Sequence, residues 1–186
     1  MKRKVFKVQV VLIILLIALL LGFLLDLVLR GVETALIYPQ KYSETVSRYS
    51  AQYSVPEELI YATIKTESNF KSDAVSSAGA IGLMQLLPET YEWLASRLGE
   101  ESDPALLYDP DTNIRFGAYY LQYLYSKFGS WEKAIIAYNW GEGNFANFLE
   151  ENGYTEGDYS SIPVGETRRY VEKVINTREK YKNLYS

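Results

Sequence analysis

Hydrophobic and polar residues follow two different patterns along this chain. From Val10 to Leu25 the residues form an unbroken apolar run, and Leu27–Leu29 extends it beyond Asp26. From about residue 54 onward, apolar residues recur three or four positions apart, which is typical of helices that bury one face. The pattern therefore predicts an apolar N-terminal segment followed by a mostly helical domain.

The domain is expected to contain a series of helices joined by short turns. The first ends at Glu67, the second spans Pro88–Leu98, the third begins near Asp111, the fourth follows Ser130 as an N-cap, and the last begins near Glu166. Ser54 and Glu57 have the spacing of a capping box for the first helix. Small residues and glycines between positions 72 and 85 predict turns and a short hairpin. The predicted fold class is therefore α+β, predominantly α-helical.

The apolar run is about long enough to cross a bilayer, which needs ~20 apolar residues. We divide the chain into a basic flank at 1–7, a transmembrane helix at 8–29, a stalk at 30–50 and a domain at 51–186. The flank is expected to stay in the cytoplasm by the positive-inside rule because it contains Lys2, Arg3, Lys4 and Lys7. The chain is then a single-pass protein of the cell membrane with an extracytoplasmic domain. A cleaved signal peptide is the alternative, and the lack of a small-x-small cleavage site after the run favours the anchor.

The chain contains neither cysteine nor histidine. This composition excludes disulfides, thiol nucleophiles, Ser-His-Asp triads and nearly all zinc sites, so the chemistry must use carboxylates, hydroxyls, amides or the 17 tyrosines. Five of the 19 basic and one of the 23 acidic residues precede residue 31, which leaves 14 and 22 and a net charge of −8. Such a domain is not expected to bind nucleic acid, and the N-terminal helix is expected to make the contact with the membrane.

Glu67 lies at the end of an apolar helix stripe. Ile60, Ile64 and Glu67 are spaced i, i+4 and i+7, which places all three on one helix face. If that face is buried, the carboxyl group loses contact with water and its pKa rises. A glutamic acid that stays protonated near neutral pH is what a general acid requires. The alternative is a boundary glutamate that is paired or reaches solvent.

Four motifs together carry a resemblance to a known family. They are ESNFKSDAVSSAGAIGLMQLLP at 67–88, DPDTNIRFGAYYLQYL at 109–124, AIIAYNWGEGNF at 134–145 and IPVGETRRYVEKVI at 162–175. Their sequences and order resemble the family 1 lytic transglycosylases, which contain the soluble-lytic-transglycosylase domain of the lysozyme-like superfamily. The resemblance covers the chain from Ser54 to Tyr181. It implies a lysozyme-like domain that acts on peptidoglycan glycan strands.

The resemblance also implies roles for particular residues. Glu67 matches the catalytic acid/base, which protonates the β-1,4 oxygen between N-acetylmuramic acid and N-acetylglucosamine. It then removes the proton of the muramic C6 hydroxyl, and a 1,6-anhydro ring closes without water. The sugar's N-acetyl group is expected to stabilise the developing cation in place of a second carboxylate. The residues expected to bind substrate are Ser68, Gly82, Met84, Gln85, Tyr138, Asn139, Glu166 and Tyr170. No cofactor or metal is implied.

The DPDTN segment resembles the first half of a calcium-binding loop. Ile114 and Tyr120 replace the glycine and the glutamate that such a loop requires. Asp109 and Asp111 are therefore expected to be turn and cap residues without a metal. Asn113 is expected to cap its helix near the N-terminus.

Two further features leave alternatives open. The family's usual AYNAG sequence is AYNWG here, so Trp140 stands where a small residue is usual. Its ring is expected either to add a stacking surface in the cleft or to pack away from it. Gly79 and Gly82 are expected either to let the backbone approach a sugar closely or only to serve a tight turn.

The leading hypothesis is a membrane-anchored lytic transglycosylase that cleaves peptidoglycan outside the cytoplasmic membrane. A muramidase of the same fold, which uses water, needs the same acid and is the first alternative. The second is a non-catalytic glycan-binding module of an envelope assembly. The sequence names no protein partner for such an assembly.

Overall fold

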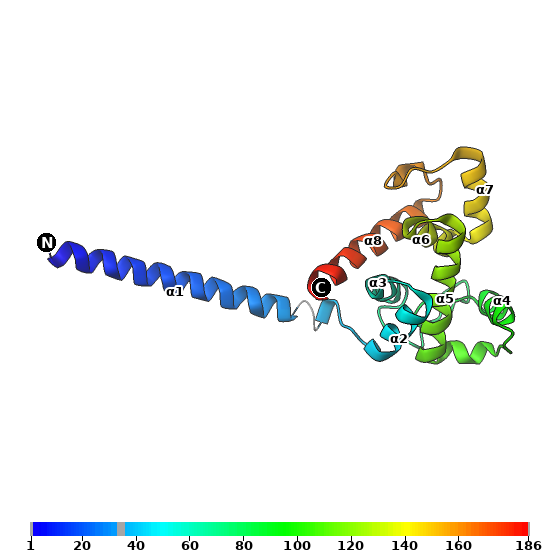
Figure 1. Cartoon of the computed structure of the whole chain (residues 1–186), viewed down its shortest axis with the longest axis horizontal. Helices are drawn as coiled ribbons and strands as arrows, with labels where there is room; N and C mark the ends of the chain where they lie inside the picture. The colour runs from blue at the N-terminus through cyan, green and yellow to red at the C-terminus, as the bar shows by residue number, and fades with distance from the viewer. Residues whose placement is uncertain (1, 33–35, 186) are drawn as a thin grey trace. The chain divides into compact units, whose positions relative to one another are not determined.

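The computed structural model describes residues 2–32 and 36–185, with side chains described from residue 10 onward. The chain divides into two units, Met1–Pro39 and Gln40–Ser186. The first contains helix α1 (Lys2–Val32), and the second contains the other helices (Figure 1). Each unit is described by itself below.

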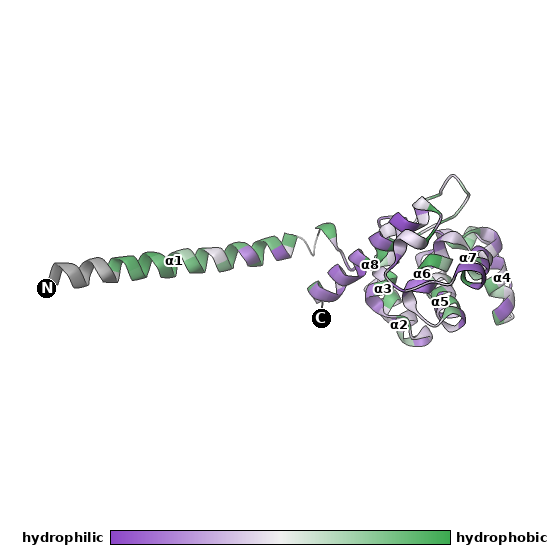
Figure 2. Ribbon diagram, turned by 90° about the horizontal axis from the view of Figure 1, so that it is seen from above, coloured by the Kyte–Doolittle hydropathy of each residue, from purple (hydrophilic) through white to green (hydrophobic). Residues whose placement is uncertain are grey.

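Helix α1 is apolar over most of its described length, as its green colour in Figure 2 shows. The part from Val10 to Val32 reaches a mean hydropathy of 3.2 with none of that window buried. Its described charges are Asp26 and Arg30, which form an exposed ion pair of 2.9 Å. By length and composition α1 can cross a membrane, and a signal sequence meets the same criteria. The side chains of the basic flank lie outside the described residues, so its orientation stays a prediction.

The second unit is built from helices. They are α2 (Ser43–Tyr53), α3 (Glu57–Glu67), α4 (Pro88–Leu98), α5 (Pro110–Phe128), α6 (Trp131–Trp140), α7 (Glu142–Asn152) and α8 (Gly165–Tyr185), with 3₁₀ helices at Pro104–Tyr108 and Tyr159–Ser161. Helix α3 packs against α8, while α5 packs against α2 and α6, and α6 also contacts α7 and α8. The core between them is apolar and includes fully buried Leu59, Ile60, Ile64, Ile136 and Val171.

The predicted helices are confirmed where the sequence signals are strong. Helix α3 ends at Glu67, and α4 spans Pro88–Leu98 as expected. The Ser130 side chain caps α6 by accepting a hydrogen bond from the Lys133 N–H, as predicted. The prediction that Ser54 and Glu57 form a capping box is wrong. Ser54 instead has a left-handed φ of 55° and ends α2, which leaves Pro56 as the N-cap of α3 without a side-chain cap.

Two helices of the domain, α2 and α7, were not predicted from the sequence. Helix α2 lies largely within the segment interpreted as a stalk, and its Val46 and Tyr49 are buried. Helix α7 follows α6 after the single residue Gly141, which has a φ of 93°. Both helices are short and polar with only two buried residues each, so few apolar positions indicate them in the sequence.

The expected β component is much smaller than an α+β fold implies. In the described part of the chain, β pairing is limited to two isolated antiparallel bridges, Val75 with Ile81 and Ile81 with Leu86. Positive φ angles at Gly79, Gly82 and Gln85 turn the backbone too sharply for longer strands. The domain is therefore mostly α-helical, with a turn-rich loop where the hairpin was expected.

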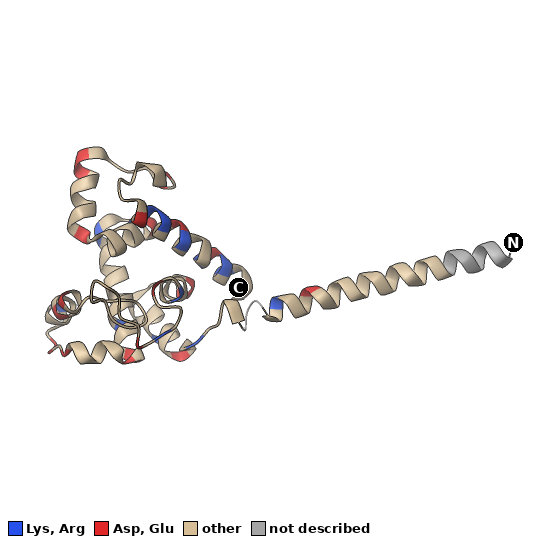
Figure 3. Ribbon diagram, turned by 180° about the vertical axis from the view of Figure 1, so that it is seen from behind, with Lys and Arg blue, Asp and Glu red and all other residues tan. Residues whose placement is uncertain are grey.

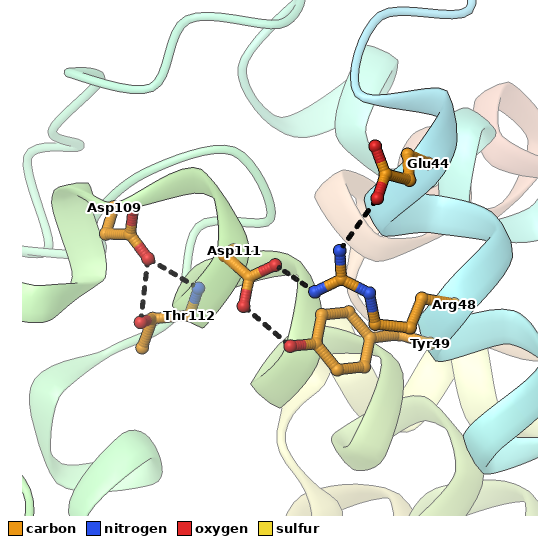
Figure 4. Close-up of polar contacts among 6 residues, drawn as sticks. All are labelled: Glu44, Arg48, Tyr49, Asp109, Asp111 and Thr112. Atoms are coloured by element: carbon orange, nitrogen blue, oxygen red, sulfur yellow. Dashed lines mark hydrogen bonds and ion pairs between the residues drawn. The ribbon is translucent and has the colours of Figure 1, made fainter.

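Polar contacts join α2 to the start of α5 (Figure 4). The Asp109 carboxylate accepts hydrogen bonds of 2.9 Å from the backbone N–H and the hydroxyl of Thr112, which confirms the predicted cap. Asp111 accepts one of 3.0 Å from Arg48 and one of 2.6 Å from the Tyr49 hydroxyl. Asp111 therefore fixes α2 to α5 rather than capping the helix.

Asn113 is fully buried and holds the turn-rich loop in place. Its side-chain N–H groups donate to the carbonyls of Ile81 (2.9 Å) and Leu107 (2.8 Å), and its Oδ1 accepts from the Met84 N–H at 2.7 Å. The prediction that Asn113 is a helix cap was wrong, since Asp109 does this. Gly82 packs so closely that a Cβ there would collide with the Asn113 side chain and the Leu107 carbonyl. The tight turn is thus the role of Gly82 that the structure shows.

Replacing Asn113 with alanine is expected to lower the free energy of unfolding by about 2 to 4 kcal/mol, because the buried Met84 N–H and Leu107 carbonyl lose the hydrogen bonds that Asn113 makes to them. Urea denaturation followed by circular dichroism measures this loss. Asn176→Ala, an exposed position on α8, is the matched control and should change the free energy by less than about 0.5 kcal/mol. Equal stabilities of the two variants would contradict the role given to Asn113.

Candidate active site

The candidate site is built around Glu67, the last residue of α3. The chain leaves the helix at Ser68, and the next two residues, Asn69 and Phe70, have positive φ angles of 49° and 65°. This sharp turn is held because the Phe70 ring is buried and lies 6.5 Å from the Tyr61 ring. Glu67 therefore sits at a rigid helix end, with apolar residues on the turns before it.

Tyr170 of α8 points its hydroxyl at Glu67. The hydroxyl donates a hydrogen bond of 2.6 Å to Glu67 Oε1 and joins residues 103 positions apart in the sequence. Burial raises the pKa of Glu67 from its ordinary value of 4.5 to about 7, although the Tyr170 hydrogen bond and the Lys173 charge both lower it. The raised pKa agrees with the prediction from the apolar stripe. The carboxyl group can therefore hold a proton near neutral pH and release it to a stronger base.

Lys173 is a candidate residue that the sequence analysis missed. It lies one turn after Tyr170 on α8, and its positive charge lowers the pKa of Glu67. Basic residues (blue) recur along α8 in Figure 3, so no single lysine stood out in the sequence. The i, i+3 spacing from Tyr170 was the available signal, because it places both side chains on the same side of the helix. Lys173 would stabilise the ionised form of Glu67.

Tyr138 of α6 connects the acid to a neighbouring pocket. Its hydroxyl donates a hydrogen bond of 2.7 Å to the Met84 carbonyl. Burial and the nearby Glu67 carboxylate raise the pKa of Tyr138 well above its ordinary value. Tyr138 also lines a pocket of about 200 Å³ together with Gln85, Asn139 and Trp140. Glu67 does not line this pocket, so Tyr138 stands between the two.

The loop residues predicted to bind substrate mostly hold the loop itself. The buried Ser68 hydroxyl lies 2.8 Å from the Leu83 carbonyl and 3.1 Å from the Ile64 carbonyl, so it ties the loop to α3. The Gln85 side-chain amide donates to the carbonyls of Ala74 (3.1 Å) and Gly82 (2.9 Å).

Met84 differs from the prediction that it binds substrate. Its side chain is completely buried, and its sulfur packs where a Cβ on Gly117 would lie. The Met84 side chain therefore belongs to the core. Its backbone supports the site instead, since its N–H bonds to Asn113 and its carbonyl to Tyr138.

The remaining predicted residues occupy different surroundings. Asn139 and Trp140 line the pocket beside Tyr138. Glu166 is exposed in the first turn of α8, where a negative charge is favourable. The structure thus brings Glu67, Tyr138 and Tyr170 together and places Glu166 on the surface of the same helix as Tyr170. The assignment of these residues to substrate binding stays a prediction.

The fold and the site define a mostly α-helical domain in which a carboxyl group of raised pKa accepts a hydrogen bond from a tyrosine hydroxyl. The profile of the Transglycosylase SLT domain family matches residues 44–160. The chain belongs to this family, as the four sequence motifs predicted.

Curated relatives of this chain are lytic murein transglycosylases. The soluble lytic murein transglycosylase of Escherichia coli strain K12 is 34% identical in an alignment of 148 positions, which covers 74% of this chain and 22% of that protein. The membrane-bound lytic murein transglycosylase C of Edwardsiella ictaluri is 34% identical over 170 residues, which cover 77% of this chain and 47% of that protein. The chain thus spans less than half the length of either relative.

A solved structure shares the fold. The lytic transglycosylase Slt of Pseudomonas aeruginosa, determined as an inactive mutant, matches with a TM-score of 0.73 and 34% sequence identity. The match covers 78% of this chain and 24% of the Pseudomonas chain. The homology to lytic murein transglycosylases therefore rests on both sequence and structure.

The raised pKa of Glu67 predicts a pH-dependent stability. As pH rises from about 4.5 to about 7, the unfolded chain loses the Glu67 proton while the folded chain keeps it, so the stability of the native protein falls. Glu67→Gln removes this titration. Between pH 4 and pH 8, the free energy of unfolding of the variant is expected to rise by about 2 to 3 kcal/mol relative to that of the native protein. Denaturation curves of both proteins across that range measure the change.

Tyr170→Phe provides a second test of this titration, because it should shift the pKa of Glu67 without removing the carboxyl group. Loss of the hydroxyl removes a hydrogen bond that favours the ionised carboxylate, so the pKa of Glu67 should rise further. The fall in stability should then extend to a higher pH than in the native protein. A difference between the native protein and Glu67→Gln that stays constant across the pH range would contradict the raised pKa.

Proposed function

We propose that this chain is a peptidoglycan lytic transglycosylase, with Glu67 as its single acid and base. The observation that carries this proposal is the Glu67 carboxyl group, which has a pKa of about 7 and accepts a hydrogen bond from Tyr170. A pKa near the working pH suits a group that must first give and then take a proton. Membership of the Transglycosylase SLT domain family supports peptidoglycan as the substrate.

In the first step, protonated Glu67 gives its proton to the glycosidic oxygen between N-acetylmuramic acid and N-acetylglucosamine. The bond from C1 to that oxygen breaks, and the acetamido oxygen of the muramic residue bonds to C1, so that the positive charge is carried by the resulting oxazolinium ring. Glu67 is then ionised. The Tyr170 hydrogen bond and the Lys173 charge stabilise this carboxylate, because both favour the ionised form.

In the second step, Glu67 takes the proton from the C6 hydroxyl of the same muramic residue. The C6 oxygen attacks C1, the acetamido group leaves C1, and the 1,6-anhydro ring closes. Glu67 is again protonated and ready for another cycle. The carboxyl group has no acidic neighbour among the groups that shift its pKa in the described part of the chain, which supports assistance by the substrate instead of a second carboxylate.

We also propose that α1 anchors the domain to the cytoplasmic membrane and that the domain acts on the outer side. Its 23 apolar-rich residues from Val10 to Val32 support a span. The short segment between α1 and α2 would keep the domain close to the membrane surface. The enzyme would then cut glycan strands in the wall layer nearest to the membrane.

Incubation of the purified protein with peptidoglycan should release muropeptides that end in 1,6-anhydromuramic acid. Glu67→Gln should lower the rate by about 10² to 10⁴, since a positioned acid contributes this much. The rate of the native enzyme should fall above pH 7, where Glu67 loses its proton before the substrate binds. Mass spectrometry of the products and a pH series of initial rates measure both effects.

Three results would contradict parts of this proposal. Products one water heavier, with reducing ends, would make the protein a muramidase. A folded protein that binds the wall but releases nothing would indicate a glycan-binding module. Full activity of Glu67→Gln would remove Glu67 from the reaction.

Membrane fractionation tests the anchor. The full chain should stay with the membranes after carbonate washing and keep its complete mass, because an uncleaved apolar helix resists extraction. Leu16→Arg combined with Leu20→Arg should release the protein from the membrane, since charges near the centre of a span are costly. A soluble protein that lacks the N-terminal segment would show a cleaved signal peptide instead.

A further inference from the structure

A second pocket also includes Trp140 in its lining. It measures about 410 Å³, and its lining includes Trp140, Asn144, Asn147, Phe148, Glu151 and Pro163. Most of these residues belong to α7, a helix that the sequence analysis did not predict. None of the described residues that line it is basic, whereas one is acidic and several carry amides. The pocket therefore does not suit a phosphate or another anion.

Trp140 is a wall shared by this pocket and the smaller one beside Tyr138 and Asn139. Its ring packs against two aromatic side chains of α7, with centroid distances of 5.5 Å to Phe148 and 6.5 Å to Phe145. Because these rings are largely buried, Trp140 is held by packing rather than left mobile. Trp140 is therefore a fixed residue common to both pockets.

The polar groups of the second pocket divide into two kinds. The amides of Asn144 and Asn152 donate hydrogen bonds back to the carbonyls of Trp140 (2.8 Å) and Phe148 (3.2 Å), so they stiffen α7. Asn147 and Glu151 are exposed one turn apart, and within the described residues they make no side-chain hydrogen bond or ion pair. Together they offer a ligand one amide, which donates and accepts, and one carboxylate, which accepts.

Pro163, which also lines the pocket, follows a loop that is firmly held. Glu132 of α6 accepts hydrogen bonds from the Tyr154 hydroxyl (2.7 Å), the Gly157 N–H (2.7 Å) and the Tyr159 hydroxyl (3.0 Å). Three donors on one carboxylate attach residues 154–159 to the first turn of α6. The pocket is therefore formed between two fixed walls, which lowers the ordering cost of binding.

We propose that this second pocket binds a further sugar ring of the glycan strand, with Trp140 stacking on the sugar and Asn147 and Glu151 bonding its hydroxyl and acetamido groups. An aromatic face beside free acceptors and donors suits a hydroxyl-rich ring, which has apolar C–H faces and polar edges. Because both pockets include Trp140, we assign this sugar ring to the same strand that would bind in the pocket beside Tyr138. This inference rests on the proposed function, because it extends the binding site of that enzyme.

The test compares glycan oligomers of different length. Glu67→Gln protein is titrated with peptide-free oligomers of alternating N-acetylglucosamine and N-acetylmuramic acid, two and four disaccharides long, in a calorimeter. The longer oligomer should bind more tightly than the shorter one. Trp140→Ala, or the double variant Asn147→Ala with Glu151→Ala, should reduce this gain in affinity by about three- to tenfold. Glu150→Ala is the matched control, because it removes one exposed charge of α7 outside the pocket and should preserve the gain.

The outcomes separate this inference from the proposed function. Loss of the length-dependent gain in the pocket variants, with Glu150→Ala unchanged, supports the subsite even if the native protein makes no anhydro product. An unchanged gain in the pocket variants overturns the inference, and muropeptide release by the native enzyme would leave the proposed function standing. A second titration uses short oligomers that carry stem peptides. If the pocket variants weaken only these, the pocket binds peptide, and the inference is likewise wrong.

Discussion

The site depends on one buried side chain, Asn113. Its amide makes three hydrogen bonds to backbone groups at positions 81, 84 and 107, which come from two separate segments of the chain. Because buried backbone groups without partners are costly, the loop adopts the one course that Asn113 permits. That course fixes the Met84 carbonyl, and the Met84 carbonyl in turn orients the Tyr138 hydroxyl. An amide one turn inside α5 thus determines where a tyrosine of α6 faces the acid.

The acid itself shows how packing produces chemistry. Glu67 lies on the face of α3 that packs against α8, so the contact that stabilises the helix pair also removes water from the carboxyl group. The protein loses stability when that carboxyl group ionises, and it gains a proton donor near neutral pH. Tyr170 and Lys173 moderate the effect, because both favour the charged form. Their presence on α8 keeps the pKa close to 7 instead of higher.

Helix α6 contributes two residues to the candidate site. Tyr138 stands near the acid, and Trp140, two residues later, lines two pockets. Gly141 then turns the chain with a φ of 93°, which lets α7 begin at once and place Phe145 and Phe148 behind the indole. Glycine suits this position because it has no Cβ, whereas a residue with a side chain would be strained at this φ angle. The position of the tryptophan is therefore fixed by the turn at Gly141 and by aromatic packing against α7.

The sequence by itself determined the strongly periodic helices, the cap at Ser130, the apolar N-terminal helix, the family, and Glu67 with its raised pKa. These features depend on local spacing, composition or a motif, and each can be recognised in a short stretch of residues. Tertiary structure alone decided the rest. It converted the expected hairpin into an Asn113-supported loop, moved the Met84 side chain into the core, and brought Tyr170 and Lys173 to an acid about a hundred positions earlier. Those outcomes depend on which helix faces pack together, and no local pattern of residues contains that information.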